Sequence, residues 1–517
     1  MSLKVSKLKF KRNRNIGKWK LIEKLGAGGN GDVWKVKNDE GEFFALKALK
    51  NIDDVTFKRF SIEESVLRNI EVDGVIKIVD SFIPETKAGG TPWFVMPLAK
   101  PFERYVENKS PLSIANDFVA LAKSLKELHE LDIAHRDIKP ENLLFLNERL
   151  VFTDFGLVKY PKRESITPQK RDVGAKFTMA PEMRRYANEA DGKCADVYSF
   201  AKTLWIALSG EVRGFDGQYV SNSILGLRNY HSELYLTSLD LLLSKATDNN
   251  PEARPSISGF IIELEKWITL NEDFEERNLT EWFELQEKLF PLGTPERTTW
   301  TDLNSIVQVI NELSKAKSLN HMFFPNGGGH TILGASLAEE EGFIALHVSE
   351  RMVELINPKK LTYESFGVDP SWDYFRLESN TIEPTGIPNA MGYKGISEEL
   401  TEVYPGEYSD YSSWEYHEYE GKPLPEVARR AQRFLKGSFV FFCTSSIYNR
   451  LTGKHDAYNA GHNTVSEDEF RAFIKAGAEY FAAQKNCLTK HLRVIRNAWH
   501  FRFAQVKPSF AHTLMRR

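Results

Sequence analysis

Residues 135–142 read His-Arg-Asp-Ile-Lys-Pro-Glu-Asn, and this stretch decides how the rest of the chain is interpreted. It supplies a carboxylate at Asp137, a cation at Lys139 and an amide at Asn142. Phosphoryl transfer uses these three groups, because a carboxylate orients the attacking hydroxyl, a cation balances charge on the γ-phosphate, and a neutral oxygen binds Mg²⁺. The stretch therefore predicts a phosphotransferase with Asp137 and Lys139 as catalytic residues and Asn142 as a metal ligand.

A second acidic motif, Asp154-Phe155-Gly156, begins twelve residues after Asn142 and offers another metal-binding carboxylate. Together the two motifs resemble the catalytic loop and metal-binding triplet of the protein kinase superfamily, in its eukaryotic-like (Hanks-type) Ser/Thr form. The resemblance implies a two-lobed fold, with a small β-rich N-lobe and a larger helical C-lobe. It also implies ATP and Mg²⁺ as cofactors and proteins as substrates.

The glycine-rich stretch at residues 26–33, Gly-Ala-Gly-Gly-Asn-Gly-Asp-Val, is compatible with this resemblance. The pattern G-x-G-x-x-G alone also occurs in dinucleotide-binding folds, where a helix follows it. Here residues 33–37 and 43–47 are instead predicted to form a hairpin, and no G-K-[S/T] follows the glycines. We therefore expect a glycine-rich hairpin whose backbone N–H groups approach phosphates closely.

The resemblance also implies where ATP binds. Lys47 corresponds to the lysine that holds the α- and β-phosphates, and its partner is a glutamate on the helix predicted at residues 57–70. Both Glu63 and Glu64 are available, and counting back from the strand expected at residues 75–78 favours Glu63. Met96 is the expected gatekeeper. The full set of predicted ATP-binding residues is Leu25, Gly26, Ala27, Gly28, Gly31, Val33, Ala45, Lys47, Glu63, Met96, Pro97, Ala99 and Leu144.

Residues 157–179 are predicted to form an activation segment rich in Lys and Arg. Arg136 indicates the kinase subclass in which this arginine pairs with a phosphorylated residue of that segment. Ser165 and Thr167 are therefore the predicted autophosphorylation sites. One position departs from the family pattern, since Ala175 stands where Ser/Thr kinases usually have a threonine.

Three further residues resemble structural anchors of the family. Glu182, in the Ala-Pro-Glu motif at residues 180–182, is expected to pair with Arg254. Asp196 corresponds to the helix aspartate that holds the backbone of the catalytic loop.

The 517 residues are too many for one hydrophobic core, so we expect several domains. The predicted order is a basic arm at 1–18, a kinase domain at 19–270, a helical connector at 271–320 and an α+β domain at 321–517. The net charge of −3 does not favour general binding to nucleic acid or anionic membrane, although the basic arm leaves nucleic acid possible. Three cysteines and no apolar run of about 20 residues favour a cytoplasmic protein without a membrane span.

The last 240 or so residues carry no motif that identifies their function. Strands are expected between residues 323 and 348, and helices at 425–435 and 466–484, the latter starting with a Ser466–Glu469 capping box. The aromatic and acidic residues 404–420 could dock a partner or the chain's own activation segment, although partial burial is the simpler interpretation. His455, Asp456 and His462 could bind a metal but lack a fourth ligand.

We therefore expect an ATP- and Mg²⁺-dependent Ser/Thr protein kinase with a regulatory or substrate-selecting C-terminal domain. One alternative is a pseudokinase scaffold that binds nucleotide and signals through a partner surface. A second is that the C-terminal half is a separate effector, such as a nuclease, that the kinase switches.

Overall fold

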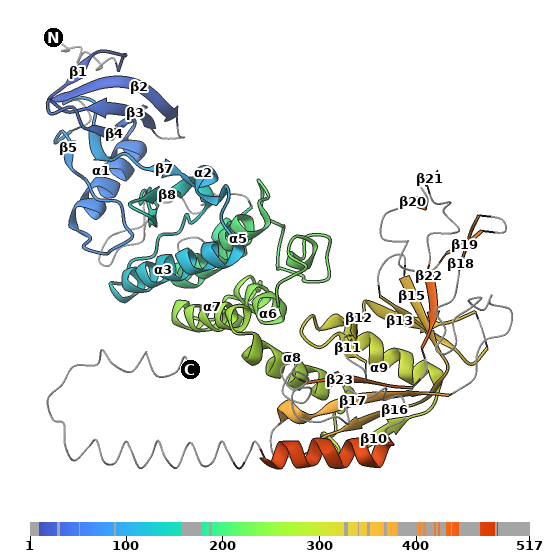
Figure 1. The fold of residues 1–517 in the computed structure, drawn as a ribbon. Helices are drawn as coiled ribbons and strands as arrows, with labels where there is room; N and C mark the ends of the chain where they lie inside the picture. The colour runs from blue at the N-terminus through green and yellow to red at the C-terminus, as the bar shows by residue number, and fades with distance from the viewer. Residues whose placement is uncertain are drawn as a thin grey trace, which may run out of the picture. The chain divides into compact units, whose positions relative to one another are not determined.

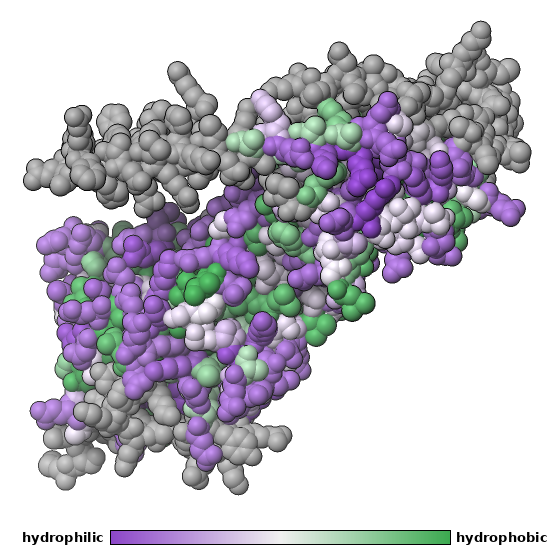
Figure 2. All heavy atoms as spheres, turned by 90° about the horizontal axis from the view of Figure 1, so that it is seen from below, coloured by the Kyte–Doolittle hydropathy of each residue, from purple (hydrophilic) through white to green (hydrophobic). Residues whose placement is uncertain are grey.

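The computed structural model divides the chain into two compact units, Met1–Glu272 and Asp273–Arg517, which are described separately below (Figure 1). The structure describes residues 10–27, 31–50, 52–86, 89–157, 177–185, 189–324, 329–339, 341–348, 352–366, 370–380, 401–404, 407–409, 418–419, 422–423, 431–435, 437–443, 466–480 and 483. Among these residues, no helix has the length and apolar character needed to cross a membrane. On the face shown in Figure 2, hydrophilic residues predominate and apolar residues form separate patches.

The first unit begins with a six-stranded antiparallel sheet in the order β1-β2-β3-β4-β6-β5. Its strands are β1 (Asn15–Ile16), β2 (Trp19–Ala27), β3 (Gly31–Lys37), β4 (Phe43–Leu49), β5 (Asp80–Phe82) and β6 (Trp93–Pro97). The predicted hairpin is confirmed, since β3 and β4 pair with Val33 opposite Lys47. Side chains alternate between the two faces of such a sheet, so Leu46 joins a small apolar cluster on one face while Ala45 joins the main core.

Helix α1 (Asp54–Asn69) packs against this sheet through Phe60, whose ring lies 5.1 Å from that of Phe94. The helix begins where Asp53 accepts hydrogen bonds from the backbone N–H groups of Val55 and Thr56. Because Asp53 and Thr56 form a capping box, the start of the helix is fixed locally by sequence.

The rest of the first unit is mostly helical. Its elements are β7 (Lys100–Pro101), α2 (Phe102–Val106), α3 (Pro111–Glu130), β8 (Leu143–Leu146), β9 (Arg149–Phe152), α4 (Pro181–Arg185), α5 (Gly192–Ser209), α6 (Thr237–Ala246) and α7 (Ile257–Glu272). Helix α5 is buried on nearly all sides, and its buried residues include the polar side chains of Asp196, Lys202 and Thr203. Its Phe200 contacts Phe118 of α3 and Phe260 of α7, so α5 forms the centre of this lobe.

Gly74 joins the segment after α1 to strand β9. Its carbonyl accepts a 2.8 Å hydrogen bond from Phe152 N, and the Phe152 carbonyl accepts one of 3.0 Å from Ile76 N. Gly74 has a φ of +86°, and a Cβ there would lie 2.3 Å from Ser124 Oγ. Only glycine therefore suits this junction.

Replacing Gly74 by alanine is expected to destabilise the protein by about 3 kcal/mol, the sum of left-handed strain and overpacking. Gly210→Ala is the matched control, because Gly210 has a φ of +71° but its Cβ would meet open space. The control should therefore cost only about 1–2 kcal/mol, the strain alone. Urea unfolding of both variants measures the difference, and equal losses would contradict the packing argument.

The second unit contains helices α8 (Phe274–Leu289) and α9 (Leu303–Lys315) and two larger sheets. The first sheet has the order β10-β16-β17-β23-β11-β12 and consists of β10 (Arg297–Trp300), β11 (His321–Phe323), β12 (Gly329–Thr331), β16 (Pro358–Glu364), β17 (Tyr374–Ser379) and β23 (Ser438–Phe442). The second has the order β13-β14-β15-β22 and consists of β13 (Gly334–Leu337), β14 (Ile344–His347), β15 (Met352–Ile356) and β22 (Ala431–Phe434).

Helices cover both faces of the six-stranded sheet. Phe375 and Phe441 pack in one cluster with Trp282 of α8 and Ile310 of α9. Their neighbours along the strands, such as Tyr374 and Phe442, pack in another cluster with Phe470. Because successive strand residues face opposite sides, helices α8 and α9 cover one face, and the helix at residues 467–480 covers the other. The segment 271–320, expected to be a connector, thus contributes α8 and α9 to a core.

Two of the three predictions made for the second unit from local sequence are confirmed, and one is wrong. The expected strands between residues 323 and 348 are confirmed by β12, β13 and β14. The Ser466–Glu469 capping box is also confirmed, with Glu469 N donating to Ser466 Oγ at 3.3 Å and Ser466 N donating to the Glu469 carboxylate at 3.1 Å.

The helix predicted at 425–435 is wrong for residues 431–434, which form β22 and pair in parallel with β15. Pairing with a distant strand outweighs local helix propensity there. Residues 425–430 lie outside the described residues, as do residues 455–462.

Candidate active site

A buried aspartate on α5 holds the backbone of the predicted catalytic loop. Asp196 has no exposed surface and accepts hydrogen bonds from His135 N at 2.7 Å and Arg136 N at 2.6 Å. The Nε2 atom of His129, on α3, lies 3.1 Å from the same carboxylate. Arg136 adopts a φ of +65°, which is uncommon for a residue with a side chain. The carboxylate of Asp196 compensates for this backbone strain and fixes the start of the loop.

The three groups predicted for phosphoryl transfer meet within this loop. Lys139 Nζ lies 2.8 Å from Asp137 Oδ2, and Asn142 Nδ2 donates to the same oxygen at 2.9 Å. Asn142 Nδ2 also donates to the Asp137 carbonyl at 2.8 Å. The other carboxylate oxygen, Asp137 Oδ1, is buried and has no hydrogen-bond partner among the described residues. An oxygen in this state suits an acceptor that takes a hydrogen bond from a substrate hydroxyl.

The second polar group spans the two lobes of the first unit. Lys47 Nζ, on β4, lies 2.6 Å from Glu63 Oε1 on α1 and 3.5 Å from Asp154 Oδ1. The choice between Glu63 and Glu64 is thereby resolved, because Glu64 instead accepts hydrogen bonds from Arg68 and Ser81. Lys47 is thus held between carboxylates of both lobes.

Electrostatics keep Lys47 and Asp154 charged near neutral pH, whereas burial raises the pKa of Glu63 to about 7 despite the attraction of Lys47. Burial opposes the charge of Lys47, but attraction by Asp154 and then Glu63 outweighs it and raises the pKa of Lys47. The positive charge of Lys47 lowers the pKa of Asp154, with smaller contributions from His135 and Lys139. A cation-binding carboxylate must be ionised, so this environment suits Asp154 as a metal ligand.

Asp154 is presented by a strained turn. Its φ of +61° lies in the left-handed region, and Phe155 after it is fully buried against the His135 ring, with centroids 4.6 Å apart. His135 Nε2 also donates to the Thr153 carbonyl at 3.0 Å. The sequence motifs assign no role to His129 or His135. The position of His135 directly before Arg136 and Asp137 was the available signal for it.

The residues predicted to contact the adenine lie on paired strands of the N-lobe and on β8. Ala45 and Met96 are buried opposite each other on β4 and β6, while Val33 and Leu144 are half-buried. The list is completed by Gly26 and Ala27 at the end of β2, Gly31 at the start of β3, half-buried Pro97 and Ala99, and Leu25, which is 48% exposed. Gly28 lies outside the described residues, as do Ser165, Thr167 and Ala175.

The expected anchor between Glu182 and Arg254 is present. Arg254 Nη1 and Nη2 donate to the two carboxylate oxygens of Glu182 at 2.6 and 2.9 Å. Arg254 Nε also donates to the Asp248 carbonyl at 2.8 Å, and its guanidinium lies 4.8 Å from the Tyr198 ring centre. A bidentate, buried pair of this kind fixes the start of α4 relative to the helical lobe.

Replacing Lys47 by methionine is expected to lower phosphoryl transfer by about 10²-fold, because a fixed charge next to the phosphates is lost. The variant should also lose about 3–5 kcal/mol of stability, because Glu63 becomes a buried, unpaired carboxylate. Rates with labelled ATP and thermal unfolding measure both effects.

Lys47→Met/Glu63→Gln is the matched control for that variant. It should recover much of the stability and none of the rate. Recovery of the rate would show that Lys47 acts only through folding.

The first unit thus combines a β-rich lobe and a helical lobe with a polar site that contains two aspartates and a lysine, an arrangement typical of phosphotransferases. Comparison with known proteins identifies the family: the model of the protein kinase domain matches residues 19–278. The chain therefore belongs to the protein kinase family, whose members use ATP with a divalent metal and act on proteins.

The relatives found are also kinases. The chain is 26% identical over 205 residues to the serine/threonine-protein kinase AfsK of Streptomyces griseus, which covers 38% of this chain and 25% of AfsK. It is 28% identical over 265 residues to mitogen-activated protein kinase kinase kinase 1 of Arabidopsis thaliana, covering 48% of this chain and 42% of that protein. This chain thus spans less than half the length of either relative.

Among solved structures, the PknI kinase domain of Mycobacterium tuberculosis matches with 21% identity and a TM-score of 0.37. The match covers 50% of this chain and 100% of that domain.

Proposed function

We propose that this chain transfers the γ-phosphate of ATP to Ser or Thr hydroxyls of proteins. The observation that carries the proposal is that two polar groups, Asp137–Lys139–Asn142 and Lys47–Glu63–Asp154, come from adjoining segments. The two segments are joined directly before Asp154, where Thr153 N donates a 3.0 Å hydrogen bond to the Asn142 carbonyl. The names of the relatives support a Ser/Thr kinase, and Lys139 occupies the position at which Ser/Thr kinases carry lysine.

Each side chain has a separate task in the proposed reaction. Asp137 Oδ1 accepts a hydrogen bond from the substrate hydroxyl and orients it, while Oδ2 is held by Lys139 and Asn142. Lys139 balances the charge that develops on the transferred group. Lys47, positioned by Glu63, holds the phosphates of ATP, and apolar side chains including Ala45 and Met96 enclose the adenine.

Asn142 and Asp154 would hold the divalent metal, proposed to be Mg²⁺. The donor set fits this ion, because both are oxygen ligands and the environment of Asp154 favours its ionised form. Bound Mg²⁺ would neutralise charge on the β- and γ-phosphates. The protein contributes position and electrostatic field rather than covalent chemistry.

Labelled phosphate transfer tests this proposal against a pseudokinase scaffold. The purified chain is incubated with γ-labelled ATP, Mg²⁺ and a generic basic protein, and acid hydrolysis then identifies the modified amino acids. Phosphoserine or phosphothreonine supports the proposal. Nucleotide binding without transfer would support the scaffold, which the complete set of polar groups does not favour.

We further propose autophosphorylation at Ser165 or Thr167. Arg136 supports this, since burial lowers its pKa even against the attraction of Asp196, and a nearby phosphate would offset that cost. Phosphosite mapping after incubation with ATP tests the idea. A fully active enzyme with both residues unmodified would contradict it.

The second unit is proposed to regulate the kinase or select its substrates. Support comes from its own apolar cores, which can present a surface independently of the kinase unit. Phosphoproteomes of cells expressing the full chain or residues 1–272 provide the test, and identical substrate sets at equal kinase activity would exclude both roles.

A further inference from the structure

Three cations share one face of the six-stranded sheet in the second unit. Arg297 lies on β10, Lys360 on β16 and Arg376 on β17, which are neighbouring strands. The register places them on the same side, because Arg297 pairs with Glu364, Lys360 with Glu378, and Arg376 with Thr362. Positions on paired strands are fixed by the sheet, so this cation cluster is preorganised.

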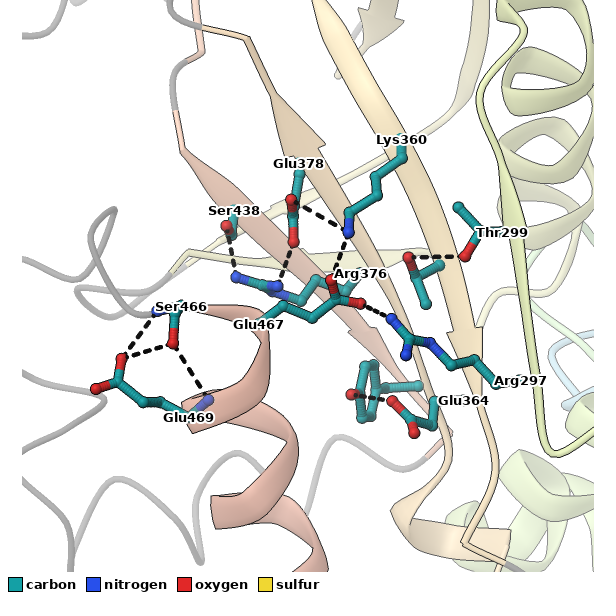
Figure 3. A network of polar contacts seen from close by, with 12 residues as sticks. Arg297, Thr299, Lys360, Glu364, Arg376, Glu378, Ser438, Ser466, Glu467 and Glu469 are labelled. Atoms are coloured by element: carbon teal, nitrogen blue, oxygen red, sulfur yellow. Dashed lines mark hydrogen bonds and ion pairs between the residues drawn. The ribbon is translucent and has the colours of Figure 1, made fainter.

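The resident counter-ion comes from a different segment of the chain. Glu467, at the start of the helix at residues 467–480, directs one carboxylate oxygen to Arg297 and the other to Lys360 (Figure 3). Burial alone would raise the pKa of Glu467, but the hydrogen bond from Lys360 and the charges of Lys360, Arg297 and Arg376 lower it. The cluster therefore holds an oxyanion at this point.

The charge of the cluster exceeds that of its resident carboxylate. The strands supply three cations and Glu378, which contacts Arg376 and lies 3.8 Å from Lys360, so their sum is 3 − 1 = +2. Glu467 reduces this sum to +1. Glu364 lies on the same face but does not change this net charge, because Arg471 of the helix forms an ion pair with it. A dianion in place of Glu467 would neutralise the strands completely.

Burial and hydrogen-bonding capacity also suit an anionic ligand. The side chains of Arg376, Lys360 and Arg297 are 4%, 20% and 37% exposed, so the cluster is desolvated on the sheet side and open at β10. Ser438, whose Oγ accepts a 2.9 Å hydrogen bond from Arg376 Nη2, has a hydroxyl hydrogen to donate. Charge-assisted bonds from arginine are the common means of binding phosphate.

We propose that Arg297, Lys360 and Arg376 form a binding site for a phosphate monoester or phosphate ion, in which Glu467 is an internal substitute that the ligand displaces. A phosphate group carries about −1.5 to −2 charges at pH 7 and three acceptor oxygens, against one charge and two oxygens for Glu467. Phe470 and Ile474 keep the helix on the sheet by apolar packing, so displacement is confined to its first turn. The site lies outside the kinase unit, and its test does not depend on phosphoryl transfer.

Calorimetric titration of the full chain tests the proposal, with inorganic phosphate in one arm and a short phosphoserine peptide in the other, at constant ionic strength. Glu467→Gln should bind at least tenfold more tightly than the wild type in at least one arm, because the internal competitor is neutral. Adding Arg297→Gln to that variant should remove the gain. A gain only in the inorganic phosphate arm would identify free phosphate as the ligand. A gain only in the peptide arm would identify a phosphorylated protein. Phosphate bound in the kinase unit contributes equally to all variants.

Glu312→Gln is the matched control, since Glu312 also lies between two cations, Lys288 and Lys315, but on helices rather than on a sheet. It should gain no phosphate affinity. An equal gain in Glu312→Gln, or no gain in Glu467→Gln in both arms, would overturn the proposal. If Glu467→Gln does not fold, the melting temperatures of the wild type and of Arg297→Gln are compared with and without phosphate. Phosphate should raise the melting temperature more in the wild type. Equal shifts in the two proteins would refute the site.

Discussion

Replacing Asp137 by alanine is expected to lower phosphoryl transfer by about 10³-fold or more while leaving nucleotide affinity largely unchanged. Asp137 contacts Lys139 and Asn142 of its own loop, whereas the nucleotide is assigned to Lys47 and the N-lobe. Under the proposed roles, the variant loses the group that orients the hydroxyl and keeps the predicted ATP-binding residues in place. Steady-state rates with labelled ATP and titration with a fluorescent nucleotide measure the two quantities separately.

Asp132→Asn is the control for the Asp137 variant. Asp132 lies a few residues before the loop, is largely exposed and pairs with Lys193. Its φ of +62° is also one that asparagine tolerates, so the same charge is removed without strain. The control should retain full activity. A comparable loss in both variants, or a loss of nucleotide affinity that matches the loss of rate in Asp137→Ala, would contradict the assigned role.

The polar groups of the candidate active site could be predicted because most of them lie in short motifs. The spacing from Asp137 to Asn142 is set by the hydrogen bonds between them, so the sequence itself records the geometry. The partner of Lys47 was harder to predict, because Glu64 follows Glu63 directly in the sequence. The two differ only in which side of α1 faces β4, and that depends on how the helix packs.

The second unit was harder to predict, because its structure depends on contacts between distant residues. Residues 431–434 form a strand only because β15 lies beside them, and the isolated segment resembles a helix. The cluster around Glu467 joins residues 107 and 170 positions apart. No local pattern records such a contact, so the cation cluster could be found only in the folded structure.

The second large effect is expected at Asp196, which has no exposed surface and touches no substrate group in the proposed reaction. Asp196→Ala should reduce stability by about 3 kcal/mol or more, because the backbone N–H groups of His135 and Arg136 lose a charged acceptor in a buried place. The rate per folded molecule should also fall steeply. The strained φ of Arg136 is then no longer compensated, and Asp137 follows directly in the chain.

Asp240→Asn separates these two effects. Asp240 is also buried in the helical lobe, where it accepts a hydrogen bond from Tyr219 and pairs with Arg228, far in sequence from the catalytic loop. Its variant should lose stability but keep its rate per folded molecule, measured below its melting temperature with the folded fraction from circular dichroism. If both variants lose rate only in proportion to their unfolded fraction, Asp196 stabilises the lobe without positioning Asp137. A loss of rate confined to Asp196→Ala shows that a carboxylate on α5 sets the geometry of a loop more than fifty residues earlier in the chain, through two backbone hydrogen bonds.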